Sequence, residues 1–370
     1  MRTAAVLLSR QALRPCGRDE WVRKSAEAIN WVKDRGLRLC SSCGMQTWDL
    51  LTSLGSIGKV RQLIVVPAAG NKDFQQRIKG ALEQFELAWE RTEFLDLQLT
   101  TEMAKDRRIW PFRDRVVVGE ADLLVPVSIR GGGSMETLIE QERLQGKQLI
   151  DDFRIAYRGR SAPLAYHIKP GRLNPCLDEV GAGFLIHWTR TFNSAWPGER
   201  LIEYYRAVVS SDRYPRTAFD SLLNIATEKT IRASSRHMPS GTPTVSFSGR
   251  KPCEMAALMK WRARYREMSF EPYGIGIEKR SALALGVRPV NYRQNRSKAP
   301  SEKGQPSPAW LTQSGGVKAD WTREDEYRFK GDLDLSRLDV NKVALFCHKV
   351  EEARHLERVT GIRALSFEAP

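Results

Sequence analysis

The chain has 370 residues, of which 41% are hydrophobic, and its 59 Lys and Arg against 44 Asp and Glu give a formal net charge of +15. This length and apolar content suffice for two domains with cores, and no apolar run has the length of a membrane span. The positive surplus favours a polyanionic partner. Attachment to a ribosome or a membrane surface stays open, but arginines spread along the chain fit DNA better.

The N-terminal residues 1–13 lack a secretory cleavage pattern, so we expect an initial strand or helix there. Only two of the cysteines, in Cys40-Ser-Ser-Cys43, are close in sequence, and no histidines complete a metal site at matching spacing. We therefore expect reduced thiols, no metal and a cytoplasmic protein. The six cysteines are Cys16, Cys40, Cys43, Cys176, Cys253 and Cys347.

The first 160 residues alternate helical patterns with short apolar runs typical of buried strands. The expected helices are 21–36, 45–54, 73–87, 110–120 and 136–146, and the expected strands are 37–40, 63–66, 94–99 and 123–129, with 149–157 closing the unit. Such alternation predicts an α/β fold with a Rossmann-like parallel sheet over residues 1–160.

The loop 41–44, Ser-Ser-Cys-Gly, follows the strand 37–40 and precedes a helix. In a Rossmann-like sheet this is the first turn that faces a phosphate, which makes Ser42 and Gly44 candidate ligand-side residues. An ordinary helix cap explains the loop equally well. No complete G-x-G-x-x-G is present, so the sequence does not support NAD binding in the Rossmann mode.

Three glycines, Gly131, Gly132 and Gly133, follow the apolar run 123–129, and Ser134 comes next as a candidate helix cap. A helix N-terminus behind such a turn attracts anions. Arg113 and Arg115 precede the strand and favour a phosphate ligand, although the glycines are also consistent with a plain tight turn.

This stretch resembles the SLOG superfamily of Rossmann-like domains, which includes the DprA and LOG groups. The resemblance rests on 112–119 (Phe-Arg-Asp-Arg-Val-Val-Val-Gly), 121–125 (Ala-Asp-Leu-Leu-Val) and 132–137 (Gly-Gly-Ser-Met-Glu-Thr), and extends over about residues 20–155. It implies that Arg113, Arg115 and the glycine turn bind a nucleotide phosphate. It also makes Glu136, with Glu140 nearby, a candidate for cleaving an N-glycosidic bond, although the spacing departs from the LOG pattern by one residue.

Residues 161–180 are expected to be a linker, and 181–370 a second, α+β domain. Its expected strands are 184–190, 242–248, 273–277 and 288–292, and its expected helices are 199–210, 217–230 and 253–266. Residues 293–316 are rich in Ser, Lys, Gln, Pro and Gly, so they predict a loop that becomes ordered on nucleic acid. The basic residues of that loop are Arg293, Arg296, Lys298 and Lys303.

The segment 321–328, Trp-Thr-Arg-Glu-Asp-Glu-Tyr-Arg, has two carboxylates and a guanidinium at alternate positions. On a strand, Glu324, Glu326 and Arg328 would share one face. A solvated edge strand with an ion pair is one interpretation. The other, which we favour, is a carboxylate tuned by arginine for catalysis.

The second half is similar to AbiGi-like abortive-infection proteins and, more distantly, to the ADP-ribosyltransferase fold of the DarT group. The resemblance lies in the order of 187–189 (His-Trp-Thr), 224–234, 245–248 (Val-Ser-Phe-Ser), 273–277 (Tyr-Gly-Ile-Gly-Ile) and the late glutamates. It implies that His187 or Thr189 positions a sugar, and that Glu324 or Glu326 acts as the acid or stabilises a ribocation.

Both resemblances concern the bond between a sugar and a base. We therefore expect a defence enzyme that releases a modified or foreign base from phage DNA without a cofactor. NAD-dependent ADP-ribosylation and a non-catalytic nucleotide sensor or DNA-binding module remain alternatives. The expected DNA contacts are Arg190, Arg262, Arg264 and Arg328, and the aromatic side chains placed among arginines are Trp188, Trp261, Tyr265, Trp310 and Trp321.

Overall fold

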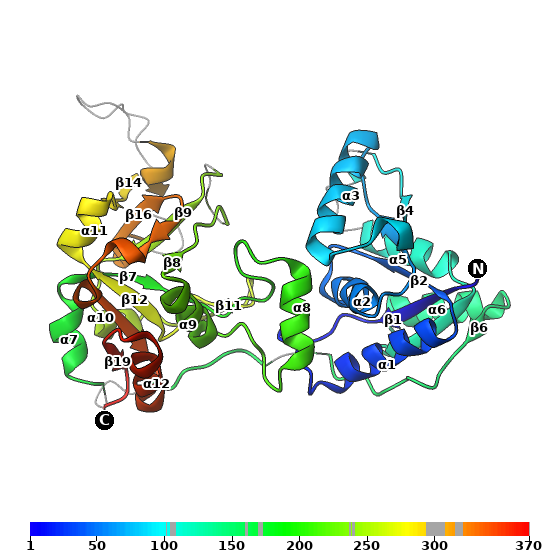
Figure 1. Ribbon diagram of the computed structural model, residues 1–370, viewed down its shortest axis with the longest axis horizontal. Helices are drawn as coiled ribbons and strands as arrows, with labels where there is room; N and C mark the ends of the chain where they lie inside the picture. Colours follow the sequence, from blue (N-terminus) through cyan, green and yellow to red (C-terminus); the bar gives the residue numbers. More distant parts are fainter. Residues whose placement is uncertain are drawn as a thin grey trace. The chain divides into compact units, whose positions relative to one another are not determined.

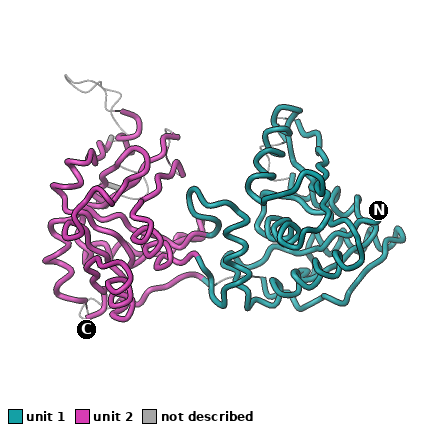
Figure 2. The backbone as a smooth tube through the Cα atoms, viewed as in Figure 1, with its two compact units in different colours: residues 1–162, 193–215 teal, residues 163–192, 216–370 magenta. Residues whose placement is uncertain are grey.

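The computed structural model describes residues 1–369 except 101, 104–108, 160–161, 169–172, 237, 239–240, 294–307 and 315–320. The chain forms two compact units, coloured separately in Figure 2. Unit 1 comprises Met1–Ala162 and Asn193–Pro215, and unit 2 comprises Pro163–Phe192 and Arg216–Pro370. No helix in the described ranges combines the length and the hydropathy that a membrane crossing requires.

Unit 1 is built on a six-stranded parallel sheet with the order β4-β3-β2-β1-β5-β6. Its strands are β1 (Thr3–Leu8), β2 (Arg38–Ser42), β3 (Gln62–Val66), β4 (Thr92–Asp96), β5 (Leu123–Ser128) and β6 (Gln148–Leu149). Every residue of β1, β3 and β5 is buried, as expected of strands covered on both faces. The order reverses between β1 and β5, so the fold is Rossmann-like, as the sequence predicts.

Helices connect these strands and cover the sheet (Figure 1). α1 turns an apolar stripe inwards with Trp21, Ile29 and Val32, whereas α2 is buried over most of its length. The helices described in the first 162 residues are α1 (Glu20–Asp34), α2 (Gln46–Ile57), α3 (Asn71–Phe85), α5 (Ile109–Gly119) and α6 (Ser134–Leu144). They match the five expected helices to within a few residues at each end.

Unit 1 also contains a segment that the sequence assigns to the second domain. Residues 193–215 belong to unit 1, although the chain before and after them belongs to unit 2. The residues that flank this segment are hydrogen-bonded to each other, since the Phe192 N–H donates to the Arg216 carbonyl at 3.0 Å. The segment carries α8 (Leu201–Ser210), whose Tyr204, Tyr205 and Val208 are buried in the core of unit 1. The expected boundary at residue 181 therefore differs from the structural one.

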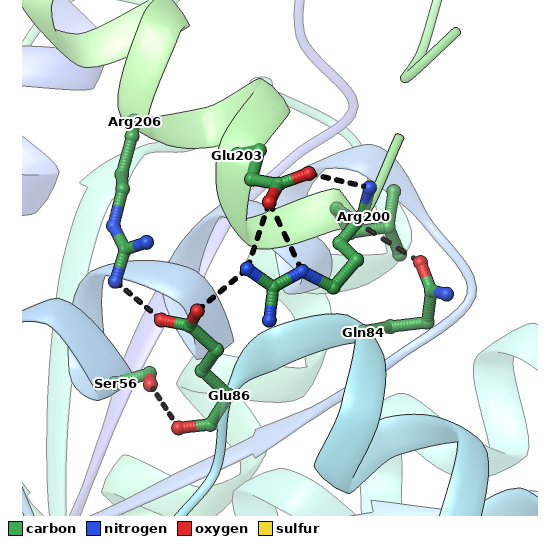
Figure 3. Close-up of polar contacts among 7 residues, drawn as sticks. Ser56, Gln84, Glu86, Arg200, Glu203 and Arg206 are labelled. Atoms are coloured by element: carbon green, nitrogen blue, oxygen red, sulfur yellow. Dashed lines mark hydrogen bonds and ion pairs between the residues drawn. The ribbon is translucent and has the colours of Figure 1, made fainter. Parts of the chain in front are cut away.

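Figure 3 shows how polar contacts attach α8 to α2 and α3. Glu86 accepts hydrogen bonds from Arg206 and Arg200, the latter at 2.7 Å, and the Arg206 bond holds the pKa of Glu86 below its usual value. Gln84 accepts from the Leu201 N–H at 3.2 Å, and Ser56 donates to the Glu86 carbonyl at 3.0 Å. These contacts fix the start of α8 over the end of α3.

Unit 2 is an α+β unit with a seven-stranded mixed sheet in the order β13-β16-β9-β7-β12-β18-β19. Its strands are β7 (Phe184–Trp188), β9 (Thr244–Ser248), β12 (Gly274–Glu278), β13 (Arg288–Pro289), β16 (Glu326–Lys330), β18 (Val343–Cys347) and β19 (Ala364–Ser366). Neighbouring strands are antiparallel except β18 and β19. The helices described in this unit are α7 (Cys176–Gly181), α9 (Ala218–Glu228), α10 (Pro252–Ala256), α11 (Lys279–Leu285) and α12 (Val350–Thr360).

Two expectations for the second half change, and a third concerns residues that lie mostly outside the described ones. The linker assigned to 161–180 contains α7, whose Leu177 is buried in the core of unit 2, and Asn174 N–H donates to the Phe367 carbonyl at 3.0 Å. The helix expected over 253–266 ends at Ala256, and the antiparallel pair β10 (Trp261–Arg262) and β11 (Glu267–Met268) follows. Most of the loop assigned to 293–316, including Arg296, Lys298 and Lys303, lies outside the described residues.

Candidate functional site

The glycine turn of unit 1 is occupied by a side chain of its own helix. Gly132 has a φ of 66°, which favours glycine, and its N–H donates to Glu136 Oε2 at 2.7 Å. Ser134 is the first residue of α6 and Gly133 stands at the cap position, so the expectation that Ser134 caps the helix is wrong. An anion bound at Gly132 would have to displace the Glu136 carboxylate.

The point where the strand order reverses, between β1 and β5, is closed by hydrogen bonds. Ser9 Oγ accepts from the Arg130 N–H at 2.9 Å, and the Ser9 N–H donates to the Ser128 carbonyl at 2.9 Å. The buried Gln11 amide donates to the carbonyls of Ser9 and Ser128 at 3.1 and 3.2 Å. Ligands of such sheets often bind at this point, but here the two loops are tied to each other.

The residues predicted after β2 have different environments. Ser42 is buried in the strand and donates to the Val65 carbonyl at 2.6 Å, so its hydroxyl is directed into the sheet. Gly44 is exposed with a φ of 85°, and its N–H donates to Asp49 Oδ1 at 2.7 Å. Burial raises the pKa of Asp49 to about 7, against the hydrogen bond from Gly44 and the charge of Arg113.

Arg113 and Arg115 also differ. Arg113 is fully buried, donates to Asp114 Oδ1 from Nε and Nη2 at 3.2 and 2.9 Å, and lies 4.6 Å from the Trp110 ring centroid. Trp48 Nε1 donates to the same carboxylate oxygen at 3.0 Å. Buried charges need partners, and these contacts make Arg113 part of the unit 1 core. Arg115 is exposed on the same helix.

In unit 2, two charged residues of β16, Glu326 and Arg328, form a buried ion pair. Arg328 is 2% exposed and donates to both carboxylate oxygens of Glu326, each at 2.8 Å. It also donates to the Trp310 carbonyl at 2.9 Å, and Ser246 on β9 donates to Glu326 at 2.8 Å. The prediction that Glu326 and Arg328 share a face is confirmed. The expected contact between Arg328 and DNA is not compatible with this burial.

Glu324 belongs to the 3-10 turn Trp321–Glu324 that leads into β16, and not to the strand itself. Its carbonyl accepts from the Ser248 hydroxyl at 2.6 Å, which fixes its backbone against β9. Burial, followed by the neighbouring Glu326, raises the pKa of Glu324 to about 7, while Arg262, Arg190 and Arg328 act in the opposite direction. A carboxyl with this pKa can both donate and accept a proton near neutrality.

A second buried carboxylate, Glu267 on β11, holds the arginines beside Glu324. Arg236 Nη2 lies 3.1 Å from Glu267 Oε2, and Arg190 Nη1 lies 3.6 Å from Oε1. Arg262 on β10 is the cross-strand partner of Glu267. Burial lowers the pKa of Arg190, with Arg236 and Arg262 contributing, whereas Glu267 raises it.

We call this set of groups the charged cluster. Sequence reasoning missed two of its members, Arg236 and Glu267, and also missed Ser246, which donates to Glu326. The signal that could have found Glu267 is a glutamate directly after a basic run. The charged cluster consists of Arg190, Arg236, Arg262, Glu267, Glu324, Glu326 and Arg328.

The structure does not bring His187 together with the glutamates. Ile186 and Glu326 are both opposite Ser248 in the sheet, so they share a face, and His187 next to Ile186 points to the other face. Its Nδ1 lies 2.8 Å from the Ser246 carbonyl, and its ring centroid lies 6.0 Å from that of Phe247. Burial lowers the pKa of His187 to about 4. Thr189 is buried and donates to the Ala218 carbonyl at 2.9 Å.

The aromatic candidates divide into core and surface. Trp188 is buried and packs on Phe346 and Phe367, with ring centroids 6.2 and 6.0 Å away. Trp261 and Trp310 are half-buried, and the Trp321 side chain lies outside what the structure describes. Tyr265 is 41% exposed beside Arg262 and the exposed Arg264, which makes it the clearest surface aromatic of this set.

The sequence matches no known family model and no curated protein. Among solved structures, the chain is similar to the X-ray structure of DNA processing protein A (DprA) from Streptococcus pneumoniae, with 12% sequence identity and a TM-score of 0.30. The similarity covers 40% of this chain and 49% of that chain, so it spans about half of the DprA structure. A likeness of this degree carries no argument about activity, and the Rossmann-like assignment of unit 1 rests on its own sheet order.

Proposed function

We propose that the protein cleaves N-glycosidic bonds in DNA, releasing a base and leaving an abasic site, with Glu324 of unit 2 as the proton-transfer group. One observation carries the proposal: the charged cluster combines two neighbouring glutamates, Glu324 and Glu326, with the arginines Arg190 and Arg262, while the buried Arg328 pairs with Glu326. Glutamates in this arrangement can act on a sugar, and arginines can hold phosphate.

The two glutamates are suited to different tasks. Glu326 receives two hydrogen bonds from Arg328 and one from Ser246, which hold its carboxylate in one position. Glu324 has its pKa raised to about 7, so a substantial fraction carries a proton at neutral pH. Departure of a base requires a proton on the leaving nitrogen and negative charge near the developing oxocarbenium ion. Glu324 gives its proton to the leaving nitrogen, and the Glu326 carboxylate stabilises the oxocarbenium ion. A water molecule then adds to the anomeric carbon and returns a proton to the Glu324 carboxylate, which leaves an abasic site.

The wider biological role forms part of the same proposal. The net charge of +15 favours DNA as the polymer that carries the sugar. The AbiGi-like order of motifs favours defence against phage, with a modified or foreign base as the group released. This predicts that phage DNA is a better substrate than host DNA.

The test incubates the full chain with phage DNA and host DNA, identifies released bases by mass spectrometry and counts abasic sites with an aldehyde-reactive probe. Glu324→Gln should abolish base release, because an amide cannot donate the proton. The matched control is Glu351→Gln on α12, which alters an exposed glutamate of the same unit and should retain activity.

Two other outcomes would replace the proposal. Transfer of label from NAD to DNA or protein, with no free base, would identify an ADP-ribosyltransferase. Binding of DNA with no product from either substrate, unchanged in Glu324→Gln, would identify a non-catalytic binding module.

A further inference from the structure

The antiparallel pair β10–β11 forms a short hairpin with an unusual charge pattern. Four of the seven residues from 260 to 266 are basic, at alternate positions: Lys260, Arg262, Arg264 and Arg266. The segment turns back at its tip, where the N–H groups of Tyr265 and Arg266 donate to the Arg262 carbonyl at 3.0 and 2.8 Å. We call residues 260–268 the basic hairpin.

Tyr265 at the tip orders two of these arginines. The Arg262 guanidinium lies 4.6 Å from the ring centroid and that of Arg264 lies 5.6 Å from it. Cation–π contacts restrain both long side chains, which lowers the entropy lost when they bind an anion. The ring itself is 41% exposed.

Glu267 connects the basic hairpin to the candidate catalytic carboxyl. It is 7% exposed, pairs across the hairpin with Arg262, and holds Arg190 and Arg236 by ion pairs at 3.6 and 3.1 Å. The side chains of Arg190 and Arg236 remain 39% and 55% exposed. Arginines around one buried carboxylate leave a positive surplus at the surface, beside Glu324.

We infer that the basic hairpin binds the phosphodiester backbone of single-stranded DNA and presents the strand to Glu324. Cations gathered on one short hairpin suit a polyanionic backbone, and a partly exposed aromatic ring beside arginines suits unstacked bases better than a closed duplex. The inference rests on the proposed function for the role of Glu324, and it adds the form of the substrate and the surface that holds it.

The test measures binding of a fluorescent oligothymidylate by anisotropy at several salt concentrations. The triple variant Lys260→Gln/Arg264→Gln/Arg266→Gln should lower the slope of log affinity against log salt by about 2, since each phosphate contact to a single strand contributes about 0.7. The control variant Arg354→Gln/Arg358→Gln/Arg363→Gln removes three exposed cations elsewhere in unit 2 and should leave the slope unchanged.

A second variant tests the ring directly. Tyr265→Ala should weaken binding about tenfold, and Tyr265→Phe should restore most of it because the aromatic face is retained. An unchanged slope in the hairpin triple, an equal loss in the control triple, or tighter binding of duplex DNA or single-stranded RNA would overturn the inference.

The outcomes separate this inference from the proposed function. If Glu324→Gln binds single strands like the wild type and the hairpin triple loses binding, the surface is supported whether or not a base is released. If the wild type binds through the hairpin but releases no base, the proposed function fails alone. If base release and binding both persist in the hairpin triple, the inference fails and the proposed function stands.

Discussion

Replacement of Tyr205 on α8 should destabilise unit 1, although the sequence assigns this helix to the second domain. Tyr205 is 2% exposed in the unit 1 core, and its hydroxyl donates to the Gln46 carbonyl at 3.0 Å. Its ring packs against Tyr204 with centroids 4.8 Å apart. Tyr205→Ala therefore removes a buried ring and leaves a cavity next to the start of α2.

The expected magnitude follows from these contacts. Loss of a buried aromatic side chain costs about 3 kcal/mol, and loss of the hydroxyl alone, in Tyr205→Phe, costs about 1 kcal/mol. The larger loss corresponds to roughly a hundredfold faster exchange of amides that open with the unit. Leu144→Ala is the control, because Leu144 is 79% exposed in the same unit and its truncation should change stability by less than about 0.5 kcal/mol.

Hydrogen exchange read by mass spectrometry is the appropriate assay, since it reports each unit separately in the full chain. Peptides covering β1, β2 and β5 should lose protection in Tyr205→Ala, and peptides covering β12 and β18 should not. Unchanged protection of β1 and β5 would refute the reasoning, because α8 would then add nothing to the core of unit 1.

Three further predictions concern titrating or buried groups. The rate of base release should fall about tenfold per pH unit above about pH 7, because Glu324, with its raised pKa, then loses the proton that it donates. A pH–rate profile measures this fall, and Glu324→Gln should abolish the activity. Arg328→Met should lower the free energy of unfolding of unit 2 by about 3 kcal/mol or more, because it leaves Glu326 without its partner. The double variant Glu326→Gln/Arg328→Met should restore most of this stability, as measured by hydrogen exchange of β9 and β16. As the pH rises from roughly 4 to 7, the free energy of unfolding of unit 1 should fall by about 1.4 kcal/mol per pH unit, because Asp49 binds its proton more tightly in the folded chain than in the unfolded chain. Urea titrations at several pH values measure this slope, and Asp49→Asn should remove it.

The elements of unit 1 could be predicted because each carries a local signal. Most residues of the buried strands β3 and β5 are branched and apolar, and α1 shows a clear apolar stripe. The assignment of α8 could not be predicted in this way. Its buried Tyr204 and Tyr205 give an apolar face that would fit either unit, and only the three-dimensional structure shows which core receives it.

The charged cluster was predictable only in part. Alternation on a strand was sufficient to place Glu326 and Arg328 together. Arg236 and Glu267 are 31 residues apart in sequence and meet through tertiary folding, which no local pattern reports. The expected helix 253–266 extends into the basic hairpin because arginine has good helix propensity. The turn at 263–266 and the pairing of Arg262 with Glu267 determine the observed structure instead.

The turns of unit 1 are the reason why we propose the chemistry for unit 2. A turn N–H before each of α1, α2, α3 and α6 is bound by a carboxylate of the following helix or its cap. Cys16, Gly44, Ala69 and Gly132 donate to Asp19, Asp49, Asp73 and Glu136 at 2.9, 2.7, 2.9 and 2.7 Å. These carboxylates stabilise the helix N-termini and compete with any external anion at the same groups. In the charged cluster the balance is reversed, because Arg190 and Arg236 beside Glu267 have partly exposed side chains, while the raised pKa of Glu324, about 7, keeps part of this carboxyl protonated at neutral pH.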